Sequence, residues 1–293
     1  MQNNNKNSET LFTGETVLAC IDGSSVSEAV CDYASWIAST IERPLKLIHA
    51  IEQNHNPAVS DYTGAIGLGS QQELLVELTE VEQSRSSLLI KKGQLMLNAA
   101  KQRVLDFGVD SVETYQHHGS LTESLVELED DIRVMVIGIR GKLHDNKKDG
   151  IGHQLESVLR AMHKPIFVVN TEFKQPKNAM LAYDGSASCK KAVQMVASSQ
   201  LFKNIPCHLV HVGHNGEQIL GEATKTLIDA GVEVVSVQLN GQADEALANY
   251  QLEKDIDLTL MGAFSHNRFR NFLLGSFTAK MLAATNRPLL FLR

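Results

Sequence analysis

Short, nearly continuous apolar runs alternate along the chain with segments whose apolar residues recur at helical spacing. A continuous run is typical of a strand that is buried on both faces of a sheet. Strands that alternate with helices favour right-handed βαβ units and a parallel, doubly wound sheet. The pattern therefore predicts an α/β fold with ten strands, at about 16–22, 45–51, 112–117, 134–139, 166–170, 179–184, 207–212, 233–239, 258–262 and 289–292.

The same pattern of residues occurs twice, which indicates a tandem duplication. VLACIDGS at 17–24 matches AMLAYDGS at 179–186 with an offset of 162, and the offset falls to 123 or 124 further along the chain. Five landmarks keep their order in both copies. These pairs are Asp22 with Asp184, His49 with His211, Gly108 with Gly231, Gly138 with Gly262, and Pro165 with Pro288.

The repeat divides the chain into a loose tail at 1–14, a first domain at 15–170, a linker at 171–178 and a second domain at 179–293. The fall in offset leaves about 38 additional residues in the first copy, which we interpret as a helical insertion at about 52–106. Residues 71–106 have the apolar spacing of one long helix or a helical pair. Such a segment either covers the sheet or serves as a lid or partner-binding element.

Parallel sheets bind ligands at the carboxyl ends of their strands, where the strand order reverses. In the second copy, Asp184 follows the first strand, where a carboxylate either accepts from a ribose hydroxyl or caps the next helix. Gly262 ends the fourth strand, and Gly275-Ser276 opens a helix whose free N–H groups suit phosphate. Ser265 and His266 lie between them. The second copy therefore has the residues of a polyphosphate site.

The first copy departs from this pattern, although it keeps Gly138, Gly141, Gly152 and the strand-end Asp22. Ten residues rather than nine precede the helix, and His153 stands where the second copy has a serine. Acidic residues interrupt the local basic charge and oppose a polyphosphate. We therefore expect weak or absent nucleotide binding in the first copy.

Composition narrows the classes of partner. The chain of 293 residues has a net charge of −7, which gives no electrostatic footprint for nucleic acid or membrane surfaces. Its amino-terminal stretch has no apolar core of a signal peptide, and four scattered cysteines are expected to be free thiols. The sequence predicts a cytoplasmic protein with no metal site, no membrane partner and no nucleic-acid partner.

These residues resemble the universal stress protein family (UspA-like), over about 15–293, as a bacterial tandem member. The resemblance rests on the strand-one Asp motif, a loop close to G-x-x-G-9x-G-[ST], a proline before the last strand, and the segment IGLGSQQELLVELTEVEQSRSSLL. One departure is Ser265 in place of the second glycine. The resemblance implies two tandem Rossmann-like (adenine nucleotide alpha hydrolase-like) domains, each a five-stranded parallel doubly wound sheet flanked by helices.

The resemblance also implies a stress-response regulator that binds ATP, with or without Mg²⁺, mainly in the second domain. The implied ligand residues are Asp184, His211, Gly262, Ser265, His266, Gly275, Ser276 and Phe277, with Asp22, Gly138, Gly141 and Gly152 as weaker counterparts. Since no G-x-S-x-G, H-E-x-x-H or Walker A lysine is present, no catalytic residue is assigned. A weak ATPase and an interaction scaffold without nucleotide remain alternatives.

The last strand of each copy has a role in assembly in the family that the chain resembles, where it pairs with its counterpart across a dimer. Here PIFVVN at 165–170 and PLLFLR at 288–293 are expected to pair within one chain as an intramolecular pseudo-dimer. A homodimer would need a further interface, for which the 71–106 helical segment is the candidate. An unidentified regulatory protein is the other expected partner.

Overall fold

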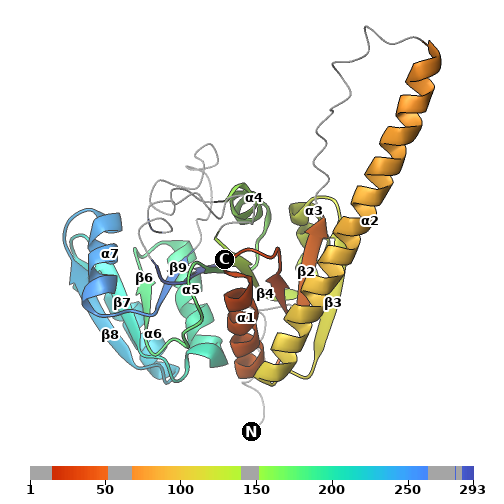
Figure 1. Cartoon of the computed structure of the whole chain (residues 1–293). Coiled ribbons are helices and arrows are strands. Elements are labelled where there is room, and N and C mark those ends of the chain that lie inside the picture. The colour runs from red at the N-terminus through yellow and green to blue at the C-terminus, as the bar shows by residue number, and fades with distance from the viewer. Residues whose placement is uncertain (1–14, 52–67, 140–151, 263–280, 282–285) are drawn as a thin grey trace.

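The computed structural model describes residues 15–51, 68–139, 152–262, 281 and 286–293 of the chain (Figure 1). All ten predicted strands are present, and each ends within two residues of its predicted bounds. The strands are β1 (Thr16–Cys20), β2 (Leu45–Ile51), β3 (Val112–His118), β4 (Ile132–Gly138), β5 (Ile166–Val169), β6 (Ala179–Ala182), β7 (Cys207–Val212), β8 (Val234–Leu239), β9 (Leu258–Gly262) and β10 (Leu289–Leu292). Continuous apolar runs were sufficient to locate them because nearly every residue of the central strands is buried.

The strands form one continuous sheet in the order β3-β2-β1-β4-β5-β10-β9-β6-β7-β8. Neighbouring strands are parallel within each half, and the two halves meet through the antiparallel pair β5 and β10. In this central pair Ile166 lies opposite Phe291, and Val168 lies opposite Leu289. The predicted fold is confirmed, and the expected pairing of the two last strands within one chain is present.

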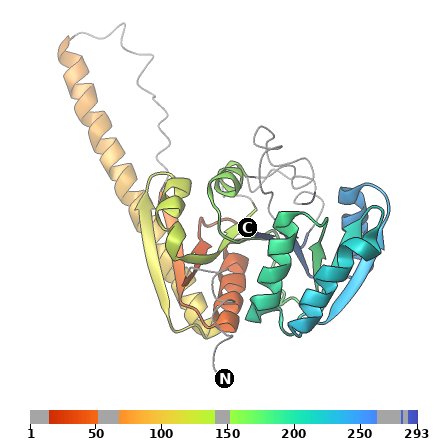
Figure 2. The ribbon, with the colours of Figure 1, turned by 180° about the vertical axis from the view of Figure 1, so that it is seen from behind.

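Helices cover both faces of the sheet, as a doubly wound fold requires (Figures 1 and 2). One apolar core packs α1, α2, α5 and α6 against one face, and a second core packs α3, α4 and α7 against the other. Along β1 the side chains alternate between them, so Val17 belongs to the first core and Leu18 to the second. The helices are α1 (Ser27–Ile41), α2 (Leu68–Phe107), α3 (Leu121–Glu127), α4 (His153–Ala161), α5 (Ala187–Ser198), α6 (Gly216–Asp229) and α7 (Ala243–Glu253), with short 3-10 turns at Glu129–Asp131 and Gln200–Phe202.

Helix α2 is a single helix of 40 residues, not a helical pair. Its last part repeats α6: Gly93 corresponds to Gly216, and GQLMLNAAKQRVLDFG at 93–108 aligns with GEQILGEATKTLIDAG at 216–231. The buried positions then coincide as well. They are Leu97, Ala100 and Val104 in α2, and Leu220, Ala223 and Leu227 in α6.

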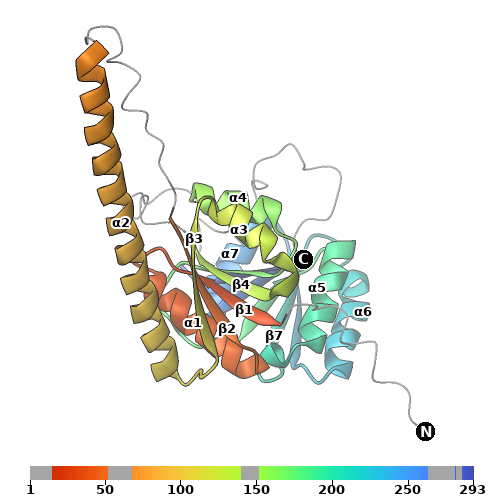
Figure 3. The ribbon, with the colours of Figure 1, turned by 90° about the vertical axis from the view of Figure 1, so that its right-hand side faces the viewer.

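Residues 93–107 are therefore the helix that both halves share, and residues 68–92, named here the α2 extension, are what the first half adds. The extension continues the same helix away from the sheet (Figures 1 and 3). At 1.5 Å per residue its 25 residues span about 37 Å. The interpretation of this segment as a cover over the sheet therefore holds only for the shared part, residues 93–107. The extension projects from the sheet.

The connection from β5 to β6 is fixed to the first half by aromatic packing. The ring of Phe173 lies 4.9 Å from that of Tyr33 and 5.7 Å from that of Phe107, both in edge-on geometry. The hydroxyl of Tyr33 lies 3.3 Å from both the carbonyl oxygen and the N–H of Lys174. These contacts hold the connection against α1 and the end of α2.

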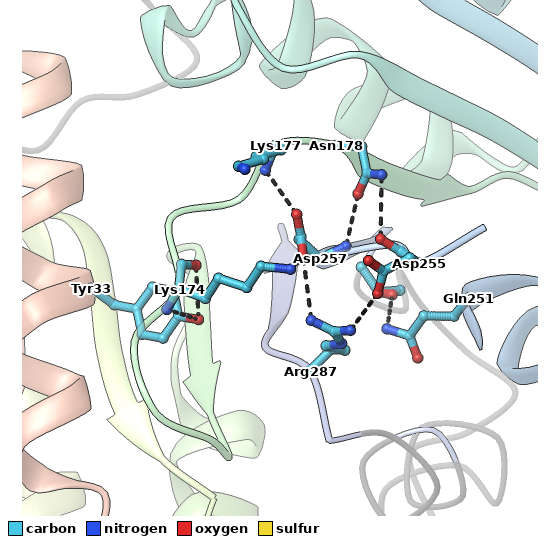
Figure 4. Close-up of polar contacts among 9 residues, drawn as sticks. Tyr33, Lys174, Lys177, Asn178, Gln251, Asp255, Asp257 and Arg287 are labelled. Atoms are coloured by element: carbon cyan, nitrogen blue, oxygen red, sulfur yellow. Dashed lines mark hydrogen bonds and ion pairs between the residues drawn. The ribbon is translucent and has the colours of Figure 1, made fainter. Parts of the chain in front are cut away.

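The same connection is fixed to the second half by a buried carboxylate (Figure 4). Asp257, only 4% exposed, accepts from Lys174 Nζ at 2.6 Å, from Lys177 N at 3.0 Å and from Arg287 at 3.2 Å. Its own N–H donates to Asn178 Oδ1 at 2.8 Å. Asp257 comes directly before β9 and Arg287 shortly before β10, so this cluster joins the connection to two strands of the second half.

Candidate functional site

The candidate site of the second half lies at the carboxyl ends of β6 and β9, which are neighbours in the sheet. Ala182 pairs with Met261, so the chain leaves β6 toward Asp184 beside the strand end at Gly262. The strand order reverses between these two strands, and the first half has the same arrangement at β1 and β4. The structure therefore brings together the predicted pair Asp184 and Gly262, and likewise Asp22 and Gly138.

Asp184 presents an exposed carboxylate at this edge. Its Oδ1 accepts from the N–H of Ser186 at 2.9 Å, while Ser186 caps α5 by accepting from the N–H of Cys189. Burial acts to raise the pKa of Asp184, but hydrogen bonds from Ser186 and Cys189 outweigh it, and the pKa lies below its ordinary value. The group is therefore an ionised acceptor at neutral pH.

His211 is buried beside the end of β6. Its Nδ1 lies 2.9 Å from the carbonyl oxygen of Tyr183, and its Nε2 lies 3.2 Å from that of His214. Both partners are acceptors, and a neutral imidazole donates from only one nitrogen, so the tautomer decides which of the two carbonyl oxygens receives the hydrogen bond. The structure gives His211 the role of holding the β6 end against the turn that follows β7.

Gln238, which the sequence analysis did not single out, completes this arrangement. It lies opposite His211 in the sheet, donates to the carbonyl oxygen of Gly213 at 2.8 Å and accepts from the N–H of Gly216 at 3.2 Å. The first half has the same pair, because Gln116 lies opposite His49. Comparing the third strands of the two copies beside the repeated histidine would have revealed this glutamine.

Gly262 is required by close packing at the end of β9. A Cβ there would lie 3.0 Å from the backbone N of Cys189 and from the carbonyl group of Ser188. Backbone atoms do not yield as side chains do, so any larger residue would displace the first turn of α5. Glycine thus lets the N-terminus of α5 approach the strand end at the switch point.

The corresponding site of the first half lies beside Asp22. Asp22 Oδ1 accepts from the N–H of Ser24 at 2.9 Å and from the hydroxyl of Ser27 at 3.0 Å. The cavity beside it measures about 30 Å³, enough for a single water, whereas ligand pockets reach roughly 300–1,000 Å³. The N–H of Gly152, at the start of α4, already donates to the carbonyl oxygen of Ile139.

Helix α2 passes directly over His49 in the first half. The Nδ1 of His49 lies 2.7 Å from the carbonyl oxygen of Ile21, as in the second half. A Cβ on Gly93 would lie 2.6 Å from His49 Cδ2 and would collide with the amide of Gln116. Gln116 in turn donates to the carbonyl oxygen of Ile90, within the α2 extension. At this point the second half has the start of a helix, and the first half has the middle of one.

Six of the predicted ligand residues lie outside the described part of the chain: Gly141, Ser265, His266, Gly275, Ser276 and Phe277. All four cysteines are free and buried, as expected, and burial raises the pKa of Cys31 and of Cys207 to about 12. Within the described ranges, no three histidine, cysteine or acidic side chains gather as a metal site. No helix there combines the length and apolarity that crossing a bilayer needs.

Comparison with known proteins agrees with this architecture. A universal stress protein from Archaeoglobus fulgidus has a similar structure, with a TM-score of 0.69 at 15% identity, covering 97% of this chain and 98% of that chain. A putative universal stress protein from Pseudomonas aeruginosa gives a TM-score of 0.60 at 14% identity, with coverage of 97% and 95%. These likenesses show the shared fold.

Sequence similarity carries the assignment further. The universal stress protein Slr1230 of Synechocystis sp. is 35% identical over 286 residues, which are 95% of this chain and 100% of that protein. The profile of the Universal stress protein family matches residues 14–170 and 213–293, one stretch in each half. The chain therefore belongs to the universal stress protein family.

Proposed function

We propose that this protein binds ATP at the carboxyl edge of the second half and acts as a nucleotide-dependent stress-response regulator. The observation that carries the proposal is the exposed, ionised carboxylate of Asp184 at the switch point beside Gly262. An ionised carboxylate only accepts hydrogen bonds, and the two hydroxyls of a ribose are donors that match it. A crevice at the reversal of strand order is where such sheets bind nucleotides.

The helix starts around this edge favour an anionic ligand. Helix α5 begins beside Asp184 and α6 begins at Gly216, and each helix start has a partial positive charge. The sequence adds Gly275-Ser276, a pair of small residues of the kind that lets phosphate oxygens approach backbone N–H groups. Together these features support a ligand that has a ribose at one end and phosphates at the other.

The first half is a poorer host for the same ligand. Its cavity has room for about one water. The N–H of Gly152 is used by Ile139, and the α2 extension replaces the helix start that the second half has at Gly216. We therefore infer that nucleotide occupies the second half preferentially.

The matched substitutions Asp184→Asn and Asp22→Asn test this inference in the full-length chain. Each keeps the side-chain shape and one acceptor for the local turn, so folding is preserved while the charge is lost. A hydrogen bond to a charged group contributes about 1.5–3 kcal/mol, so we expect Asp184→Asn to weaken ATP binding roughly ten- to hundred-fold. Asp22→Asn should leave the affinity unchanged.

Isothermal titration with ATP, with and without Mg²⁺, measures both variants against the wild type. Circular dichroism before each titration verifies that the variants are folded. Absence of heat at millimolar ATP in the wild type would refute nucleotide binding. A loss caused by Asp22→Asn but not by Asp184→Asn would place the ligand in the first half and refute the preference.

A further inference from the structure

The α2 extension exposes a regular apolar stripe. Val81 and Leu88 in the extension, and Leu95 three residues beyond it, recur at intervals of seven residues and are 62%, 67% and 71% exposed. Leu74 continues the same interval in the sequence toward the N-terminus. Apolar residues at a seven-residue repeat are typical of a helix that packs along another helix. The stripe faces solvent because the extension projects beyond the sheet (Figures 1 and 3).

A shallow groove runs along this face of the helix, lined by Glu77, Glu80, Val81, Ser84, Arg85, Leu88, Leu89 and Lys92. These positions are symmetric about the midpoint between Ser84 and Arg85. Reversing the helix direction about that point places Glu77 opposite Lys92 and Val81 opposite Leu88. The groove therefore complements itself when a second, identical helix runs antiparallel to it.

Charge along the extension is divided in the same way. Residues 68–84 contain four glutamates and no basic residue, whereas residues 85–92 contain Arg85, Lys91 and Lys92 and no acidic residue. An antiparallel partner places the acidic part of each helix beside the basic part of the other. A parallel partner would place Glu77 beside Glu77 and Lys92 beside Lys92, which is destabilising.

We propose that the α2 extension is a self-association surface, where two copies of this chain pair antiparallel about Ser84 and Arg85. Each body lies at the C-terminal end of its own α2 (Figure 1). With the two-fold axis between Ser84 and Arg85, antiparallel pairing separates the Gly93 positions of the two chains by 17 residues, or about 25 Å, and places one body at each end of the helical pair. The halves of one chain are already joined through β5 and β10, so this surface supplies the contact between chains.

A charge exchange tests the pairing. Glu77→Lys and Lys92→Glu should each raise the dimer dissociation constant about ten-fold or more, because every dimer contains the pair twice. The double variant should restore the wild-type value. Within one chain these residues are 15 positions, or roughly 22 Å, apart along the helix, so restoration reports contact between chains. Sedimentation velocity over a range of concentrations gives the constants.

Cysteine cross-linking fixes the direction, because all four native cysteines are buried. Ser84→Cys lies near the two-fold axis and should give a disulfide-linked dimer. Glu77→Cys, which lines the groove, lies about 22 Å along the helical pair from its counterpart in the antiparallel arrangement and should not cross-link. It would cross-link in a parallel pair, and that result would overturn the proposed direction.

Leu88→Lys removes the apolar centre of the stripe and should also weaken the dimer. Its control is Leu252→Lys in α7, which replaces another exposed leucine, 76% exposed, and should leave association unchanged. A chain that stays monomeric up to about 500 μM would overturn the proposal. A dimer that is insensitive to Leu88→Lys and to both charge reversals would also overturn it, since a different surface would then be responsible.

Discussion

Asp257→Asn is the substitution that best tests how the two halves are held together. The Asp257 carboxylate is buried between the connecting segment and the last two strands of the second half, and it accepts from Lys174, Lys177 and Arg287 (Figure 4). Asparagine has the same shape and keeps one oxygen for the N–H of Lys177. It removes the negative charge and points an N–H₂ group toward the side of the two cations.

The expected cost follows from burial. Removing one partner of a fully buried ion pair costs about 3–5 kcal/mol. Here the side chains of Lys174 and Arg287 are 49% and 32% exposed, so both cations recover water when the carboxylate is neutralised. We therefore expect Asp257→Asn to lower the free energy of unfolding by about 2–3 kcal/mol, below the range for a fully buried pair.

Urea unfolding followed by two probes measures this cost. The fluorescence of Trp36, the only tryptophan, reports the first half, and far-UV circular dichroism reports both halves. The two transitions should coincide in the wild type and separate in Asp257→Asn, because the cluster couples the halves. The control is Asp255→Asn, whose carboxylate pairs with Arg287 but is 73% exposed, and its expected cost is below about 1 kcal/mol.

An Asp257→Asn cost no larger than that of Asp255→Asn would refute this reasoning. It would mean that desolvation of the carboxylate cancels its contacts, so the cluster would define geometry without contributing stability. The dependence of stability on ionic strength further distinguishes Asp255 from Asp257. The exposed Asp255 pair should weaken as ionic strength rises, whereas the contribution of Asp257 should change little.

Four further substitutions have expected outcomes. Arg293→Ala removes donors to the last carbonyls of α4 and should cost roughly 2 kcal/mol in urea; no loss would contradict that role. Burial lowers the pKa of His208, so the stability that its neutral form contributes is complete above pH 6.5 and is lost as pH falls below that value. His208→Asn should therefore flatten the decrease in the free energy of unfolding at low pH. An unchanged dependence on pH would contradict this. Gly216→Ala should destabilise the protein, because the new Cβ would lie 2.6 Å from Gln238, whereas Gly221→Ala, whose Cβ meets nothing within 4 Å, should stabilise it by about 0.5–1 kcal/mol. Changes of the same sign in the two variants would contradict this account of the packing.

The sheet could be predicted from sequence because each strand needs only a short apolar run. A strand that is apolar on both faces must lie in a sheet that helices cover on both sides. The repeat also supplied the order of elements twice. The pairing of Ile166–Val169 with Leu289–Leu292 was also within reach, since both runs follow a proline and both end a copy. The strand-end pair of Asp184 and Gly262 followed from the same logic.

The extension and the Asp257 cluster could not be predicted in the same way. A seven-residue apolar repeat has the same appearance whether the helix packs on a sheet or faces solvent. The periodicity of residues 71–106 therefore did not reveal which part of the helix packs on the sheet. Gly93 marks the start of that part, but only because its counterpart Gly216 begins a helix. Asp257 is one carboxylate among 34 acidic residues, and only the folded structure, which brings Lys174 and Arg287 to it, distinguishes it.

The position of Gly93 links the two proposals. In the second half the chain enters its helix at Gly216, so the first amides of α6 stand at the carboxyl edge of the sheet. In the first half the helix begins 25 residues earlier, and the amides after Gly93 are inside a continuous helix whose hydrogen bonds they complete. Lengthening one helix thus removes an anion-favouring helix start beside His49 and creates an apolar, charge-divided rod. A single change in helix length would account both for the weaker nucleotide binding proposed for the first half and for its proposed association surface.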